Sequence, residues 1–479
     1  MNKIFLLYIT FILTASLQGQ GFSKIIDYDP SGQCQHYLVF PKHDYIYVFG
    51  DFIDSARTSI RPFWAKFDYS GQRLKFDTLW DANSQDPIIF DQSMPYVFQN
   101  DSVIIFNAQR KNNDINSSYN LNNILKINIY TGELLSAELL NVDTFGIVRA
   151  MSFDSITNRL IIATFSYEYR NIINLLEYDS SLNITDHLKI KVDSIYGIIP
   201  TYVRKSKGNY LLVGNKFIRY NMIKTIGYFL SRIDFNGNIQ YFKELESSVP
   251  LGEWLINNYR IIELKDGDFI IGGNYLVNYI PTERDANLFA HPVRVNPNFD
   301  SIRWELKMYD KPNYVYPYQF YNGLISINNE KEYIGYGDDL DTVSGGCILY
   351  KFNEDGDSLW YKRIIPGDAK RDSLGWVPTY MAAESPRGGI IVVGCVHDQR
   401  QPNYKAIRSY ILYLDDDGCL IPDCNKTVAA KDIENGKAKY FKVWPNPIKD
   451  HLQVLCNYDY KQRYSFTLIN IQGSVIWSR

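Results

Sequence analysis

The stretch "ILYKFNEDGDSLW", residues 348–360, sets a cluster of Asn, Asp and Gly between two runs in which apolar and polar residues alternate. This arrangement is typical of a β-hairpin, because Asn, Asp and Gly adopt the positive φ angles of a tight turn at low cost. Similar stretches occur seven times along the chain. They align on Asp68, Asn128, Asp179, Asp234, Asn296, Asn353 and Asp415. The recurrence predicts a repeat protein whose unit contains this hairpin.

A second hairpin precedes each copy, as in "YLVFPKHDYIYVFGD", residues 37–51. Its second strand ends at a small or amide residue, where we expect neighbouring sheets to crowd together. These residues are Gly50, Asn107, Ala163, Gly214, Gly273, Gly337 and Gly394. Each unit therefore has four strands and no helical periodicity. Seven such units predict an all-β fold, a seven-bladed β-propeller of four-stranded blades.

The two ends of the repeat region suggest how the ring closes. The seventh unit lacks a clear fourth strand, whereas "FSKIIDYD", residues 22–29, reads as a strand without a unit of its own. We predict that this N-terminal strand completes the last blade.

Composition excludes some classes of partner. The chain has 479 residues, a formal net charge of -3 and a sequence pI of about 6.1. Because no basic region is available to neutralise phosphates, we expect no nucleic-acid partner. Beyond the N-terminal leader no apolar run is long enough for a transmembrane helix, so we expect no transmembrane segment. We also expect the chain to be a monomer.

The motifs that would indicate metal or cofactor chemistry fail on inspection. The turn after Lys351 is not a calcium loop of the EF-hand type, because Lys351 occupies the first ligand position and no glutamate closes the loop. It is not a sialidase aspartate box either, since Gly356 and Trp360 are one position too far apart. No HExxH pair, nucleophile elbow, P-loop or dinucleotide fingerprint is present. We therefore expect no metal and no cofactor, and we assign no catalytic residue.

The chain divides by composition into four segments. Residues 1–19 have the layout of a cleaved signal peptide, with one lysine, an apolar run, and then small and amide residues. Residues 20–424 hold the propeller, residues 425–440 a polar linker, and residues 441–479 a small C-terminal β-module of sandwich type. Export permits disulfides, and proximity favours a bond between Cys419 and Cys424. Three pairings remain open for Cys34, Cys347, Cys395 and Cys456.

The C-terminal module begins with "FKVWPNPIKDHLQVLC", in which a Pro-Asn-Pro turn separates two alternating strands. The stretch "LINIQGSVI" then adds a hairpin that turns on Gly473. Together these stretches resemble the type A C-terminal sorting domain of proteins exported by the type IX secretion system of Bacteroidota. The matching residues are Val443, Pro445, Asn446 and Pro447, followed by the second hairpin.

The resemblance implies that the type IX machinery is a partner and that the protein is secreted or displayed on the outer cell surface. Members of that family usually continue for two further strands, so the resemblance covers a partial sorting domain. If this module does not function in sorting, the resemblance implies a periplasmic location.

Two classes of function fit these predictions. We favour a non-catalytic scaffold that binds an extracellular protein or glycan. The alternative is a glycan- or peptide-active hydrolase or lyase with its site in the central channel. Convergent carboxylates, histidine or arginine at one mouth of the channel would favour the enzyme, and an aromatic, uncharged mouth would favour binding.

Aromatic residues expected at the rim of the channel are the candidate binding residues. They are Trp254, Tyr259, Trp376, Tyr380, Tyr202 and Tyr318. Their rings could stack on sugars or on an extended peptide, and a packing role between blades is the alternative for each of them.

Overall fold

The structure is a computed structural model in which the chain forms two compact units, residues 1–422 and residues 423–479. In the first unit it describes residues 21–420 except 27, 29–32, 54–59, 80–87, 91–94, 111–120, 167–170, 193–196, 207, 220–222, 247–253, 257–259, 273, 278–286, 307–318, 340–345, 367–376 and 399–405. In the second unit it describes 440–444, 453–457, 467–469 and 475–478.

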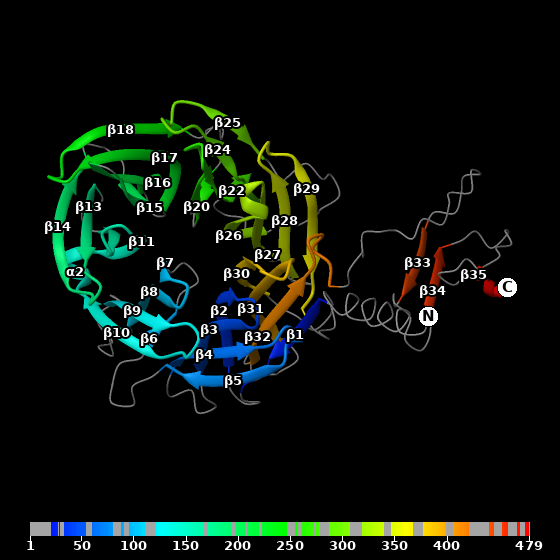
Figure 1. Cartoon of the computed structure of the whole chain (residues 1–479). Coiled ribbons are helices and arrows are strands. Elements are labelled where there is room, and N and C mark those ends of the chain that lie inside the picture. The colour runs from blue at the N-terminus through cyan, green and yellow to red at the C-terminus, as the bar shows by residue number, and fades with distance from the viewer. Residues whose placement is uncertain are drawn as a thin grey trace, which may run out of the picture. The chain divides into compact units, whose positions relative to one another are not determined.

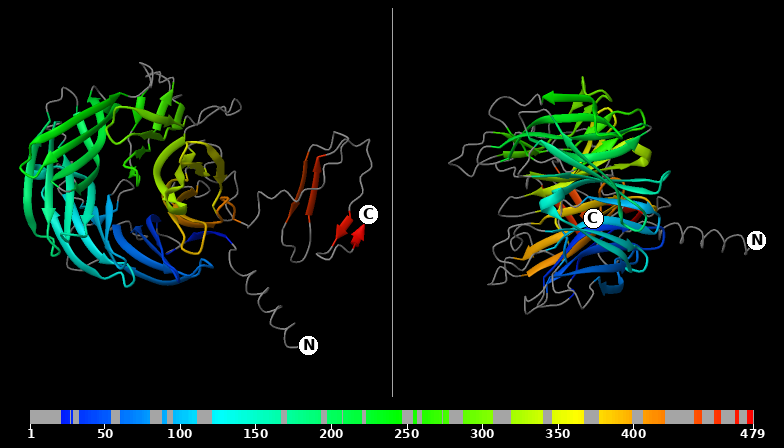
Figure 2. Two further views of the ribbon diagram at one scale, coloured as in Figure 1. Left: turned by 45° about the horizontal axis from the view of Figure 1, so that its top comes forward. Right: turned by 90° about the vertical axis from the view of Figure 1, so that its left-hand side faces the viewer.

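The first unit is a ring of seven antiparallel sheets around a central channel (Figure 1), which Figure 2 shows tilted and from the side. Blade 1 consists of β2 (Gln33–Pro41), β3 (Ile46–Ile53), β4 (Ile60–Phe67) and β5 (Arg73–Thr78). Blade 2 consists of β6 (Ile88–Ile89), β7 (Tyr96–Asn100), β8 (Val103–Arg110), β9 (Leu121–Asn128) and β10 (Leu134–Leu140). The short helix α2 (Val142–Phe145) leads to blade 3, which consists of β11 (Ile147–Asp154), β12 (Arg159–Phe165), β13 (Ile172–Tyr178) and β14 (Ile184–Lys191).

Blades 4 to 7 continue the ring. Blade 4 consists of β15 (Gly197–Ser206), β16 (Asn209–Arg219), β17 (Ile223–Asp234) and β18 (Ile239–Glu246). Blade 5 consists of β20 (Ile261–Glu263), β21 (Phe269–Ile271), β24 (Val293–Val295) and β25 (Ile302–Glu305). Blade 6 consists of β26 (Gln319–Ile327), β27 (Glu332–Asp339), β28 (Gly346–Asn353) and β29 (Ser358–Ile364), with the 3-10 turn η1 (Asn328–Glu330) after β26. Blade 7 consists of β30 (Thr379–Glu384), β31 (Ile390–Asp398), β32 (Ala406–Leu414) and β1 (Phe22–Ile26). The predicted seven-bladed propeller of four-stranded blades is confirmed.

The N-terminal strand closes the ring, as predicted. β1 pairs antiparallel with β32, from Phe22 opposite Tyr413 to Ile26 opposite Ser409. The seam between blades 7 and 1 is also joined by His36, whose Nδ1 lies 3.2 Å from the carbonyl oxygen of Tyr410. Strand β1 therefore supplies the outermost strand of a blade whose other three strands begin only at Thr379.

Blade 5 departs from the regular pattern. Its strands are short, and three additional strands, β19 (Trp254–Ile256), β22 (Asn274–Val277) and β23 (Asn287–Ala290), join the extended β17 of blade 4. The sheet of blade 4 consequently contains seven strands. The repeat pattern of the sequence did not predict this extension.

The seven aligned Asx residues all begin the turn between the third and fourth strands. In five of these turns the side-chain oxygen accepts from the backbone N–H groups two and four positions later, and the turns at Asn128 and Asn296 are one residue longer. In Asn353, for example, Oδ1 accepts the backbone N–H groups of Asp355 at 3.1 Å and Asp357 at 2.8 Å. Asp234 does the same for Asn236 at 3.0 Å and Asn238 at 2.7 Å. The predicted hairpin turns are confirmed, and the side chain of the first residue satisfies two backbone donors that the turn would otherwise leave to water. These turns, and those between the first and second strands, lie on one side of the ring, which we call the turn face.

A side chain of one blade also covers the turn of the next blade. The Trp304 indole of blade 5 lies over Gly356 of blade 6, and its Nε1 donates to the carbonyl oxygen of Glu354 at 2.8 Å. The Trp360 indole in turn lies over Gly418 of blade 7, with Nε1 3.4 Å from the carbonyl oxygen of Asp416. We call such a contact a staple. Trp64 over Gly132, and Phe22 of β1 over Gly71, continue the staples around the ring. The stretch at 348–360 thus contains one end of each of two staples.

The small residues at the end of the second strands have a different reason from the one predicted. A Cβ atom on Gly50 would lie 2.0 Å from the carbonyl oxygen of Gln35, and one on Gly394 would lie 2.0 Å from that of Pro378. Gln35 lies in β2, the innermost strand of blade 1, and the strand register breaks just after it, between His36 and Leu38. Pro378 directly precedes β30, the innermost strand of blade 7, whose register breaks between Thr379 and Met381. The crowding comes from this β-bulge and not from a neighbouring sheet. Gly273 lies outside the described residues.

The second unit contains two antiparallel pairs, β33 (Tyr440–Trp444) with β34 (Gln453–Asn457) and β35 (Thr467–Ile469) with β36 (Val475–Ser478). Val443 lies in β33, and Pro445, Asn446, Pro447 and Gly473 lie outside the described residues. The predicted sandwich and its sorting role stay predictions. No helix in the described part of the chain is long and apolar enough to cross a membrane.

The cysteines of the ring are buried. Cys34, Cys347 and Cys395 form no disulfide, so none of the three pairings left open is present. Cys419 is buried in the last turn, and Cys424 lies outside the described residues, so a bond between them stays a prediction.

Candidate functional site: a cavity in the central channel

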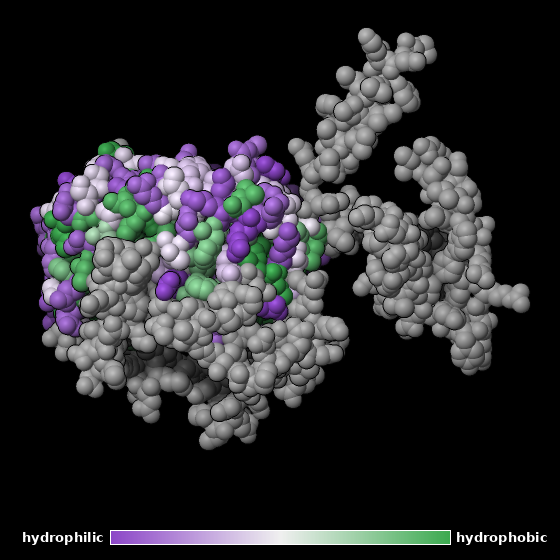
Figure 3. All heavy atoms as spheres, turned by 90° about the horizontal axis from the view of Figure 1, so that it is seen from below, coloured by the Kyte–Doolittle hydropathy of each residue, from purple (hydrophilic) through white to green (hydrophobic). Residues whose placement is uncertain are grey.

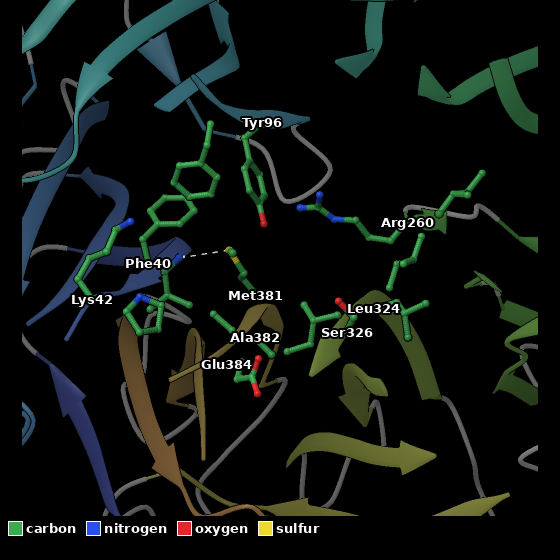
Figure 4. A pocket seen from close by; sticks show the side chains of 16 residues that line it. Phe40, Lys42, Tyr96, Arg260, Leu324, Ser326, Met381, Ala382 and Glu384 are labelled. Atoms are coloured by element: carbon green, nitrogen blue, oxygen red, sulfur yellow. Dashed lines mark hydrogen bonds between the residues drawn. The ribbon is translucent and has the colours of Figure 1, made fainter. Parts of the chain in front are cut away.

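A cavity of about 410 Å³ lies in the channel towards the turn face (Figure 4). The described residues that line it come from the innermost strands of blades 1, 2, 5, 6 and 7, or directly adjoin them. Because these strands run in the same direction around the axis, the ends of several blades contribute to one cavity. Its volume falls in the range of small-molecule sites.

Arg260 is the most distinctive side chain of the cavity. It directly precedes β20, is partly buried, and places its guanidinium carbon 4.5 Å from the centre of the Tyr96 ring in β7. Figure 4 shows the Arg260 side chain extending towards Tyr96. The side chain thus spans from blade 5 to blade 2, three blades away along the ring. The Tyr336 hydroxyl of blade 6 is a further polar neighbour.

The polar neighbours of Arg260 do not neutralise it. Burial raises the pKa of Tyr336 to about 12, so its phenol is uncharged at neutral pH. Among the described residues no carboxylate forms an ion pair with Arg260. The guanidinium itself keeps its proton at any physiological pH.

Aromatic rings form one wall of the cavity. The Phe40 ring meets the Tyr96 ring edge to face at 5.5 Å and the Phe98 ring at 5.2 Å between centroids. The Lys42 ammonium lies 5.5 Å from the centre of the Phe98 ring at the edge of this wall. These rings fix one another and leave a rigid apolar surface.

Strands β26 and β30 supply the opposite wall. Leu324 and Met381 are buried there, and Met381 Sδ accepts the backbone N–H of Val39 at 3.2 Å. Glu384 accepts the backbone N–H of Asn328 at 2.8 Å, which ties its carboxylate to η1. Figure 4 shows Glu384 apart from Arg260 and Tyr96.

Two of the six predicted rim aromatics have described side chains, and neither lines the cavity. Tyr380 is buried in β30, with its hydroxyl 3.3 Å from Gln35 Oε1 and 3.5 Å from Cys395 Sγ. Its ring centroid lies 4.7 Å from that of Tyr37 across the closing seam. Burial, the largest effect, raises the pKa of Tyr380 well above its usual value.

Tyr202 joins two blades. Its hydroxyl donates to Glu263 Oε2 at 2.5 Å, and Glu263 also pairs with Arg204 at 2.9 Å. Its ring contacts the buried Phe269 ring of blade 5. Trp254 lies in β19 with its side chain undescribed, and Tyr259, Tyr318 and Trp376 lie outside the described residues. A ligand-binding role for these six residues stays a prediction.

Ionisable groups away from the cavity are engaged between or within blades. Glu177 of blade 3 accepts from Lys205 Nζ at 2.5 Å and from the Tyr210 hydroxyl, both in blade 4. Arg294 binds Asp268 at 2.8 Å and Asp266 at 2.6 Å within blade 5. No group of three or more potential metal ligands occurs in the described ranges. These pairs fit a structural role.

Sequence reasoning missed Arg260 and Tyr96. Both belong to irregular inner segments: Tyr96 begins β7, where the first strand of blade 2 is split, and Arg260 directly precedes the short β20. The available signal was position alone, because both fall in the first strand of their unit and that strand lines the channel in a propeller.

No protein-family model and no curated protein matches the chain. Among solved structures, polysaccharide lyase Uly1 is similar with a TM-score of 0.46 and 8% identity, over 84% of this chain and 93% of that one. The β-propeller domain of the Trilobed protease from Pyrococcus furiosus is similar with a TM-score of 0.41 and 10% identity, over 85% of this chain and 99% of that domain. Lignostilbene dioxygenase from Pseudomonas brassicacearum is similar with a TM-score of 0.42 and 10% identity, over 82% and 92% of the two chains. At this level none of the three activities carries over to this chain.

Proposed function

We propose that this chain is an exported, non-catalytic binding protein that takes its ligand into the channel cavity near the turn face. The observation that carries the proposal is the composition of the cavity wall. Rigid aromatic and aliphatic side chains from five blades surround a few separated polar groups. Such a wall is typical of a site that binds and orients a small molecule or the end of a chain.

Binding is favoured over turnover because the wall lacks a described acid–base pair. Glu384 is held by the backbone of η1, and the nearest cations, Lys42 and Arg260, contact aromatic rings. General acid–base catalysis requires two proton-transferring groups within reach of one substrate atom. The described lining supplies no such pair.

The export part of the proposal rests on the two ends of the sequence. The leader-like residues 1–19 and the sorting-like residues 441–479 support passage to the outer surface by the type IX system. Hydrophilic and hydrophobic residues are mixed over the coloured surface of the ring (Figure 3), which is compatible with an aqueous environment.

Export is tested by expressing the chain with and without residues 431–479 in a host with that system. Surface exposure to added protease only in the longer form is expected, and equal exposure would contradict the sorting role.

Binding is tested on the full chain by thermal unfolding against a panel of small molecules, peptides and glycans. A true ligand raises the unfolding midpoint and is recovered unchanged by mass spectrometry. The variant Ser326→Phe narrows the cavity and should abolish the shift, while Ser180→Phe in an exposed turn of blade 3 should keep it. Cleavage of a panel member would instead indicate a hydrolase or lyase. A shift that survives Ser326→Phe would place the binding elsewhere.

A further inference from the structure

Among the described residues, the lining of the cavity carries an excess of positive charge. Three charged side chains line it among the described residues, namely Arg260, Lys42 and Glu384. Lys42 and Glu384 are opposite in charge, which leaves the Arg260 guanidinium as the excess. A cation that is partly removed from water without a counter-charge costs free energy unless a partner supplies one.

The aromatic contact does not offset this cost. Stacking on the Tyr96 ring is a weak attraction, whereas the removal of a charge from water is costly unless a counter-charge is near. The Tyr336 phenol is neutral and offers only a hydrogen bond. Among the described residues that line the cavity, the one carboxylate, Glu384, bonds to the backbone of η1 and forms no ion pair with Arg260. The guanidinium of Arg260 is therefore a hydrogen-bond donor set that faces the cavity without a described counter-charge.

We propose that the ligand of this cavity carries a carboxylate that pairs with Arg260, attached to an apolar or aromatic body. This inference rests on the proposed function and specifies its ligand. A planar guanidinium matches a carboxylate through two parallel N–H···O bonds. The neighbouring Ile261, Leu324 and Met381 then contact the body of the ligand.

The other side chains of the wall select against strongly polar ligands. A sugar brings several hydroxyl groups that need partners once water is displaced. The described wall offers few polar side chains besides the three charged ones, chiefly Ser326 and Tyr96. A phosphate carries more charge than one arginine balances. A ligand with a single carboxylate on an apolar body pairs with Arg260 and has no other polar group that needs a partner in the wall.

The proposal is tested with two probes of equal shape, 4-phenylbutyrate and 4-phenylbutyramide, titrated calorimetrically into the full chain. We expect the acid to bind at least about 30-fold more tightly than the amide, the effect of a charge pair worth about 2 kcal/mol. The variant Arg260→Met should remove this difference, and Arg260→Lys should restore part of it. Arg232→Met is the matched control, since Arg232 also stacks on a tyrosine, Tyr241, at 5.4 Å, in the outer part of blade 4.

A second pair of probes distinguishes the source of the carboxylate. The tripeptide Gly-Gly-Phe with a free C-terminus is compared with its amide, so preference for the free form supports the proposal with a peptide end as the ligand. If acid and amide bind equally to the unaltered chain and Ser326→Phe abolishes both, the binding function stands and the carboxylate inference is wrong. If no probe binds, the inference is overturned, and the wider panel decides the binding function separately.

Discussion

Gly356 and Gly237 occupy the same position in two of the seven turns between third and fourth strands, which we call the outer turns, with φ angles of 85° and 87°. Their surroundings differ, because a Cβ atom on Gly356 would lie 2.8 Å from the Trp304 ring, whereas one on Gly237 would meet its nearest neighbour at 3.9 Å. The pair therefore separates the cost of the turn conformation from the cost of disturbing a staple.

Gly237→Ala should lower the free energy of unfolding by about 1 kcal/mol, the cost of a left-handed conformation for alanine. Gly356→Ala should cost about 1 to 3 kcal/mol more, because the added methyl group displaces Trp304. Urea unfolding followed by circular dichroism measures both. Equal losses would show that the staple contributes nothing to stability.

His36 joins blade 1 to the closing seam. Its Nδ1 donates to the carbonyl oxygen of Tyr410, its Nε2 accepts from the Tyr28 hydroxyl at 2.8 Å, and the ring is fully buried. Burial lowers the pKa of His36 to about 3, although the hydrogen bond to the Tyr410 carbonyl raises it slightly. The folded chain therefore holds this imidazole neutral in mild acid, while an unfolded chain protonates it near pH 6.5.

Between pH 6.5 and pH 3 the unfolded state thus binds one more proton at this position than the folded state. Stability from this group is complete above pH 6.5 and is lost as the pH falls, with a slope of up to about 1.4 kcal/mol per pH unit. In His36→Asn, urea unfolding should show a flatter pH dependence than in the unaltered chain across this window. Identical slopes would mean that His36 titrates normally in the fold. Hydrogen bonds from Asn183 and Asn238 lower the pKa values of the turn residues Asp179 and Asp234, so these two groups affect stability at lower pH than His36 does. Burial instead raises the pKa of Asp415.

At the scale of the element, β1 is the strand whose loss the ring should tolerate least. It covers the hydrogen-bonding edge of β32 through five register pairs, and Phe22 forms the staple over Gly71 of blade 1. Without β1 this edge is exposed, and an exposed edge strand pairs with other chains. Removal of residues 1–26 should therefore lower the unfolding midpoint and produce oligomers.

Size-exclusion chromatography with light scattering checks this prediction. A matched control replaces Ser23 with Thr, which keeps the strand and its pairing with Leu412. A truncated chain that remains monomeric and equally stable would contradict the closing role of β1.

The outer turns and the staples differ in how far sequence predicts them. The turn at Asn353 follows from local chemistry, since an amide or carboxylate at its first position and glycine at Gly356 define it within a few residues. The staple from Trp304 depends on which residue of the next blade its ring meets, some 50 positions later. The local sequence pattern does not predict this separation along the chain, so the sequence alone assigns the tryptophans to strands and to no contact with the next blade.

At the scale of the whole molecule, seven repeats predicted the ring because radial closure buries the faces that single units cannot bury. The cavity could not be predicted in the same way. Arg260 and Tyr96 lie in blades 5 and 2, where the repeat is least regular, and they meet only because the ring closes. The predicted aromatics at Tyr202 and Tyr380 instead bind neighbouring blades, because buried phenols take the nearest acceptor.

The pairing of β1 with β32 also determines when during synthesis the ring can close. Phe22 leaves the ribosome among the first residues of the ring, whereas its partner Tyr413 follows almost 400 residues later. At a synthesis rate of about 5 to 20 residues per second, the first strand waits roughly 20 to 80 seconds for its place. During that interval the other six blades can form, but the ring stays open until β32 pairs with β1. The last step of folding therefore requires the last strand of the ring.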